Sequence, residues 1–142
     1  MSFPFSCQQQ FLELTRRTPE GYAALKARMI DTTTNWKGVD HMIRNRFFGV
    51  EKHFDEQEKK WWTPALEKQQ FAWVKNEFPY LLEPEISHWL LWMSFRIPDA
   101  DIDAEVSKRV PADSEYVFAP QKAAHMTIPA IFHVQVFFRR RK

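Results

Sequence analysis

The clearest strand in the sequence is a run of β-branched and aromatic residues with two polar residues inside it: Ile131-Phe132-His133-Val134-Gln135-Val136-Phe137-Phe138. Side chains alternate between the two faces of a strand, so His133 and Gln135 face one way while Val134 and Val136 face the other. A second run, residues 86–95, is apolar on both alternating faces. That pattern is typical of a central strand covered on both sides, so the C-terminal half is predicted to form a sheet.

Shorter elements are predicted around these two strands. Aromatic and β-branched residues at 71–74 favour a strand, although a helix that starts at Thr63-Pro64 is left open. Residues 99–110 return to helical spacing, and residues 116–118 are a short strand candidate. The segment from about residue 68 to 138 is therefore predicted to be a mostly antiparallel sheet with one crossing helix.

The N-terminal part, about residues 5–62, is predicted to be helical. Thr18-Pro19-Glu20 is a good helix start, because threonine can cap a helix and proline is tolerated at its first position. Tyr22, Leu25 and Met29 then form an apolar stripe on a helix of about three turns. This helix is expected to break at residues 31–35.

A second amphipathic helix is predicted from Trp36 to the neighbourhood of Gly49, with Lys37, Arg44 and Arg46 on its solvated face. Residues 51–62 are polar, end in two tryptophans and are predicted to be a loop over the core. The paired rings of Trp61 and Trp62 are expected to act as a lid on that core, with stacking on a base or sugar as the alternative.

The composition fits one soluble domain. The chain has 142 residues, a typical domain size, and its 20 Lys and Arg against 18 Asp and Glu give a formal net charge of +2. This near-balance argues against a dedicated nucleic-acid binder. No apolar run approaches the ~20 residues of a membrane helix. The single cysteine, Cys7, cannot form an internal disulfide, so an intracellular, cytoplasmic location is expected, with the nucleus left open.

Taken together, the patterns predict a single α+β domain over residues 1–142, with N-terminal helices packed on a mostly antiparallel sheet formed by the C-terminal half. Residues Arg139-Arg140-Arg141-Lys142 are expected to form a solvated basic tail. Its functional alternative is a weak contact with nucleic acid or an acidic partner through Arg139, Arg140, Arg141 and Lys142.

Few patterns in the sequence point to catalysis. The glycines at 21, 38 and 49 are isolated, which excludes a phosphate-cradling glycine loop. There is no Gly-x-Ser-x-Gly turn for a serine nucleophile. No His-x-His or His-x-x-x-His pair occurs, so neither a metal site nor a cofactor is expected.

Polar side chains on the two main strands are the candidate site. His133 and Gln135 share one face of an otherwise apolar strand, and His88 shares a face with Leu90 and Trp92. Buried polar groups must find partners or face a cavity. Both interpretations stay open: core histidines bonded to carbonyl groups, or a functional site where the two strands are sheet neighbours.

Two blocks of the sequence resemble a domain family of unknown function whose best-known members are the fungal N-acetylglucosamine-induced proteins. One block runs from Asn76-Glu77-Phe78-Pro79-Tyr80 through Glu83-Pro84-Glu85-Ile86-Ser87-His88-Trp89-Leu90-Leu91-Trp92. The other is Ile128-Pro129-Ala130-Ile131-Phe132-His133-Val134, and the segment from Leu14 to Phe48 follows the family loosely. The resemblance brings no settled biochemical activity.

A more distant resemblance is to the histidine-triad superfamily, whose members transfer or hydrolyse nucleotidyl groups. In one branch a late strand reads His-x-His-x-Gln, and its central histidine attacks the α-phosphorus. The resemblance implies a histidine-triad-like fold, with His133 as the nucleophile and Gln135 as a phosphate contact. It departs at Ile131, which stands in place of the outer histidine. The residues in binding roles would be Asn76, Tyr80, His88 and Trp92.

Two hypotheses about function follow. The first is a small intracellular nucleotide- or sugar-phosphate-binding protein of histidine-triad-like type, with hydrolase or nucleotidyltransferase activity through His133 left open. The second is a non-catalytic interaction or structural protein that keeps the fold and has an incomplete site. The pair His133 and Gln135 favours the first hypothesis, and Ile131 favours the second.

Overall fold

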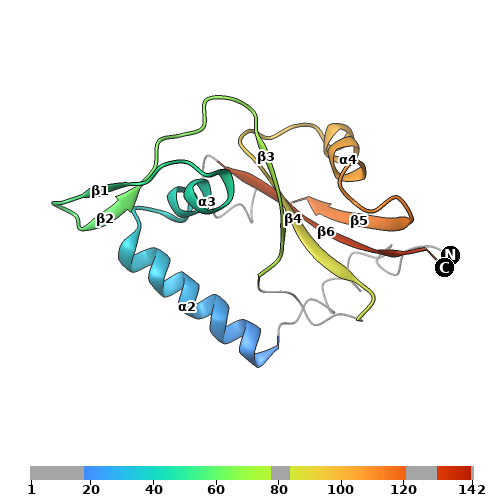
Figure 1. Cartoon of the computed structure of the whole chain (residues 1–142), viewed down its shortest axis with the longest axis horizontal. Coiled ribbons are helices and arrows are strands. Elements are labelled where there is room, and N and C mark those ends of the chain that lie inside the picture. The colour runs from blue at the N-terminus through green and yellow to red at the C-terminus, as the bar shows by residue number, and fades with distance from the viewer. Residues whose placement is uncertain (1–17, 78–83, 121–130, 142) are drawn as a thin grey trace.

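The computed structural model describes residues 18–77, 84–120 and 131–141 (Figure 1). Its helices and strands, in chain order, are α2 (Pro19–Asn35), α3 (Val39–Phe48), β1 (His53–Asp55), β2 (Lys60–Trp62), β3 (Phe71–Lys75), β4 (Ser87–Met93), α4 (Asp99–Ser107), β5 (Ser114–Pro120) and β6 (Phe132–Arg140). No helix in the described ranges is long and apolar enough to cross a membrane. The predicted α+β class is confirmed.

Four of these strands form one antiparallel sheet in the order β3-β4-β6-β5. The two runs that suggested a sheet, β4 and β6, are its central pair. Their register sets Trp92 opposite His133 and Leu90 opposite Gln135. Residues 71–75 form the strand β3, which settles the open choice between helix and strand in that segment.

Each face of the sheet has its own apolar cluster. On one face, Ile102 and Val106 of α4 pack with Leu91 and Val134 of the sheet. On the other face, Met42 and Ile43 of α3 pack with Trp36, Trp92 and Ile131. Helices therefore cover both faces, and α2 lies beside α3 (Figure 1). This coverage explains why β4 is apolar on both alternating faces.

Helix α2 begins where the sequence predicts and ends later than predicted. The Thr18 hydroxyl oxygen accepts a hydrogen bond from the Gly21 amide at 3.0 Å, which confirms the cap. The expected break at residues 31–35 is wrong, because the helix continues to Asn35. Thr32 and Thr33 donate their hydroxyl protons to carbonyl oxygens four residues back, both at 2.8 Å, so they are accommodated inside the helix.

Helix α3 starts at Val39, so Trp36 lies outside it and forms an isolated bridge with Trp61. The predicted end is confirmed: Gly49 has φ 70°, the left-handed conformation that terminates helices. The loop expected at residues 51–62 is wrong, because β1 and β2 form a hairpin there. The Trp61 and Trp62 rings are half-buried, and Trp61 packs on the cluster of α3, as the lid interpretation predicts.

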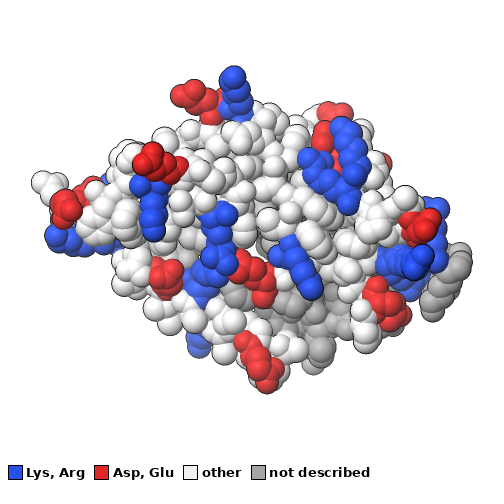
Figure 2. All heavy atoms as spheres, in the orientation of Figure 1, with Lys and Arg blue, Asp and Glu red and all other residues white. Residues whose placement is uncertain are grey.

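Two expectations about basic residues are wrong. Arg44 was expected on a solvated face, yet it is 3% exposed and donates to Asp40 Oδ2 at 3.1 Å and to the Thr63 hydroxyl at 3.1 Å. A basic tail was expected from Arg139, yet β6 continues to Arg140, and the buried Arg139 side chain pairs with Glu115 at 2.5 Å. Of that tail, Arg140 and Arg141 are exposed, and Lys142 lies outside the described residues. Figure 2 shows basic and acidic side chains interspersed over the face that it displays.

Candidate functional site

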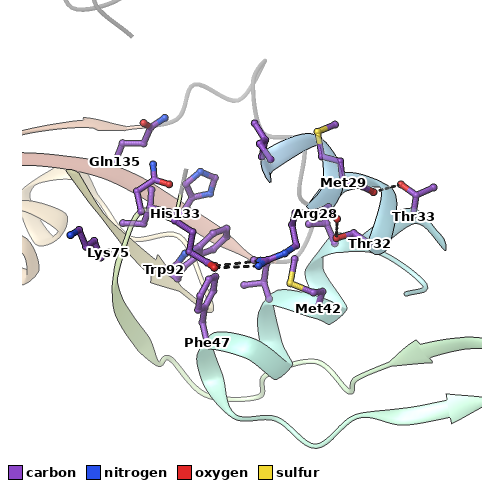
Figure 3. Close-up of a pocket in the computed structure, with 16 residues that line it drawn as sticks. Arg28, Met29, Thr32, Thr33, Met42, Phe47, Lys75, Trp92, His133 and Gln135 are labelled. Carbon is purple, nitrogen blue, oxygen red and sulfur yellow. Dashed lines mark hydrogen bonds and ion pairs between the residues drawn. The ribbon is translucent and has the colours of Figure 1, made fainter. Parts of the chain in front are cut away.

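A cavity of about 520 Å³ lies between the sheet and the helices α2 and α3 (Figure 3). Its wall on the helix side is mainly apolar, with Leu25 and Met29 from α2 and Met42 and Phe47 from α3. Its wall on the sheet side is polar where β3 ends and along β6, with Asn76, His133 and Gln135. Most ligand pockets combine an apolar lining with a few convergent polar groups in this way.

A hydrogen-bonded trio lies on the sheet side of this pocket. Gln135 Oε1 is 3.0 Å from His88 Nε2, and the Asn76 Nδ2 amide is 3.2 Å from His88 Nδ1 and 3.1 Å from Nε2. One tautomer satisfies both neighbours: Nε2–H donates to Gln135, and Nδ1 accepts from Asn76. Because the oxygen of the Gln135 side chain is engaged, its NH₂ group is the part left to donate to a ligand.

The sheet register produces this trio. The Asn76 backbone N–H donates to the His88 carbonyl oxygen at 3.0 Å, which extends the pairing of β3 and β4 by one residue. Gln135 stands opposite Leu90, one pleat from His88, and a diagonal pair on neighbouring strands is within reach of long side chains. His88 is 4% exposed, and its ring stacks on Phe137 with centroids 4.2 Å apart. His88 therefore supports the pocket from behind and does not line it.

His133 lies next to this trio without a hydrogen bond to it. Its ring packs against Trp92 with centroids 4.4 Å apart, and Trp92 in turn stacks on Phe47 at 5.7 Å. Within the described residues, its buried Nδ1 has no hydrogen-bond partner. Burial lowers the pKa of His133 from 6.5 to about 4, so the imidazole is neutral at physiological pH.

The structure thus brings most of the predicted site residues together. Four of them line one pocket: Asn76, Trp92, His133 and Gln135. His88 is hydrogen-bonded to two of the four, and Tyr80 lies outside the described residues. Among the residues that the structure describes, no group of three or more His, Cys, Asp or Glu is placed to hold a metal ion.

A charged cluster at the edge of the pocket was not predicted from the sequence. Arg28 Nη1 and Nη2 donate to Glu77 Oε1 and Oε2 at 3.3 and 3.2 Å, and Figure 3 shows these bonds as dashed lines from Arg28. Arg46 Nε and Nη2 donate to the same two oxygens at 3.0 and 2.5 Å. Burial by itself would raise the pKa of Glu77, but the hydrogen bonds and charges of Arg46 and Arg28 lower it below its ordinary value. The carboxylate is therefore ionised at neutral pH.

Lys75 also borders the pocket, but its side chain lies elsewhere. In the register Lys75 stands opposite Trp89, which places it on the α4 side of the sheet, and Figure 3 shows it pointing away from the cavity. No local signal could have identified the charged cluster, because its three members come from α2, α3 and the segment after β3.

Comparison with known proteins places the chain in a family. The sequence model of the family described as "Protein of unknown function (DUF3605)" matches residues 5–126. The chain belongs to this family. The matched range includes α2, α3, β3 and β4 and ends before β6, which carries His133 and Gln135. The predicted membership of a domain family of unknown function is confirmed.

Structural comparison adds information on the fold alone. The crystal structure of HTC1 superposes with a TM-score of 0.59 and 14% sequence identity, covering 94% of this chain and 80% of that one. No curated protein matches the chain. These comparisons do not show the likeness to the histidine-triad superfamily.

Proposed function

We propose that the chain binds a small phosphorylated ligand, a nucleotide or a sugar phosphate, in the pocket between β6 and the two helices α2 and α3. The observation that carries this proposal is the polar patch on the sheet side of the pocket, where His88 fixes the amide of Gln135 beside a neutral His133. A volume of about 520 Å³ lies within the range of roughly 300–1,000 Å³ that is usual for small-molecule sites.

The chemistry of the lining supports a ligand with an anionic group and a less polar body. Among the described residues at this edge, two arginines and one glutamate sum to a charge of +1, which attracts anions. The NH₂ group of Gln135 donates a hydrogen bond and suits an acceptor such as a phosphoryl or carbonyl oxygen. Apolar side chains of α2 and α3 provide contacts for a base or a sugar ring.

Thermal-shift screening with nucleotides and sugar phosphates tests this proposal, because a ligand that binds only the native state raises Tm. Gln135→Ala should reduce the ligand-induced shift by removing the oriented donor. Gln57→Ala is the matched control, since Gln57 is exposed in the β1–β2 hairpin and lies outside the pocket. The absence of any shift with wild-type protein would contradict the proposal and leave the interaction or structural hypothesis.

Nucleotidyl transfer through His133 is a second candidate function, because the ring lines the pocket and is in the neutral form that can act as a nucleophile. In that reaction a ring nitrogen would attack the α-phosphorus, and the leaving phosphate would depart with the electrons of the broken P–O bond. Water would then attack the same phosphorus, the P–N bond would break with its electrons returning to the ring, and the proton lost by the water would pass to solvent. His133→Ala should then abolish turnover and keep ligand binding. Mass spectrometry of wild-type protein incubated with nucleotides should detect a nucleotidyl-histidine adduct. The absence of both adduct and turnover would leave binding alone.

A further inference from the structure

The cluster of Arg28, Arg46 and Glu77 has more positive than negative charge. Two guanidinium groups share one carboxylate, and the pKa of Glu77 is low enough to keep that carboxylate ionised. A phosphate monoester carries about −1.5 to −2 charge at pH 7 and three strong acceptor oxygens. It therefore matches two arginines better than a single carboxylate does. Arginine forms bidentate pairs with phosphate and carboxylate alike, so the same donors serve either group.

Among the described residues, Glu77 is the carboxylate that the two arginines share, and it is partly exposed. The side chains of Arg28, Glu77 and Arg46 retain 25%, 31% and 44% of their exposure, so solvent screens the ion pairs. Within α2, Thr32 is the single buried residue, so the helix that carries Arg28 is lightly packed. Exchange of the Glu77 carboxylate for another anion does not require the core to open.

The cluster also adjoins the rest of the proposed site. Arg28 and Glu77 line the same cavity as His133 and Gln135, and Arg46 precedes Phe47, another lining residue. Figure 3 shows the Arg28 side chain extending from α2, with its two hydrogen bonds to Glu77 drawn as dashed lines. An anion held by the two arginines would therefore extend its attached group toward the apolar and polar walls already described.

We propose that Glu77 occupies, in the ligand-free protein, the place that the phosphoryl group of the ligand takes on binding. Glu77 then competes with the ligand for Arg28 and Arg46, so this carboxylate sets the affinity of the site. The inference rests on the proposed function for the nature of the organic ligand. Its central claim, that removal of one carboxylate opens a phosphate site, is testable with inorganic phosphate alone.

Isothermal titration of the full chain with inorganic phosphate at low ionic strength is the test. Glu77→Gln should bind phosphate on the order of tenfold more tightly than wild type, the scale of coupling between competing groups. The gain should shrink as salt is added. Arg28→Gln on the Glu77→Gln background should abolish the gain, because it removes one of the two guanidinium groups.

Glu105→Gln is the matched control. Glu105 also accepts hydrogen bonds from two cations, Lys108 at 3.1 Å and Arg109 at 2.8 Å, but it lies on α4, on the other face of the sheet. Its replacement should leave the phosphate affinity unchanged. An equal gain in Glu105→Gln would show general exposure of cations and would overturn the inference.

Equal phosphate affinity of wild type and a folded Glu77→Gln variant would also overturn it. If Glu77→Gln does not fold by circular dichroism, wild type is titrated with phosphate while the arginine side-chain NMR signals are followed. The signals of Arg28 and Arg46 must then shift at lower phosphate concentrations than those of Arg109, and any other order refutes the inference. Tighter binding of inorganic phosphate by Glu77→Gln, together with no binding of nucleotides or sugar phosphates, would refute the proposed function and support this inference.

Discussion

Replacement of His133 with phenylalanine removes a titrating group from the pocket wall and keeps a ring against Trp92. The exchange breaks no hydrogen bond of the ring within the described residues, because Nδ1 is buried there without a partner and the ring's contact is with Trp92. We expect the variant to fold at pH 7.5. Its stability should depend less on pH than that of the wild type.

The magnitude follows from the pKa of His133. Burial lowers it from 6.5, the value expected in the unfolded chain, to about 4 in the fold. Between these two pH values the unfolded state binds more protons than the native state, so stability rises with pH and is lost as pH falls from 6.5 to 4. At ~1.36 kcal/mol for each unit of pKa, the stability lost over the whole pH range is about 3 kcal/mol. About 2 kcal/mol of this loss has already occurred at pH 5.

Urea denaturation followed by circular dichroism at pH 7.5 and pH 5.0 measures this difference. Wild type should lose about 2 kcal/mol more than His133→Phe between the two pH values. His133→Gln, which is polar and does not titrate, should show the same reduced dependence whatever its stability at pH 7.5. An equal loss in wild type and both variants would refute the assignment of a buried, neutral His133.

Three further predictions concern the scaffold. Trp92→Ala should lower the free energy of unfolding by about 3–5 kcal/mol, because it empties a large buried site between α3 and the sheet, and denaturant titration would measure it. Thr18→Ala should cost about 0.5–2 kcal/mol by removing the α2 cap, and an unchanged Tm would argue against that cap. Arg44→Ala should cost about 3–5 kcal/mol because Asp40 loses its buried partner; the loss should be smaller in the double variant that also carries Asp40→Asn.

Much of the candidate site could be predicted from β6 and β4. Alternation along a strand depends only on neighbouring residues, so the shared face of His133 and Gln135 and that of His88 and Trp92 were visible in the sequence. The pairing of the two strands could only be guessed. The structure confirmed it and showed that His88 bonds to Gln135 and stands behind the pocket.

Local signals also determined several boundaries. The Thr18 cap and the Gly49 stop depend on hydrogen bonds and dihedral angles within a few residues, and both were predicted correctly. The helix break expected at residues 31–35 was wrong. That prediction rested on the composition of these residues and left out the hydrogen bonds that Thr32 and Thr33 make inside a helix.

By itself, the sequence determined the α+β class, the two central strands and the faces on which their polar residues lie. Tertiary structure alone decided which distant groups meet. Arg28 and Glu77 are 49 positions apart, and Arg46 and Glu77 are 31 apart. Arg44 is buried where it meets Thr63, 19 positions further along the chain, and the helical spacing of Arg44 does not reveal that contact. Local patterns encode the direction of a side chain along its own element, whereas the partner it reaches depends on how separate elements pack.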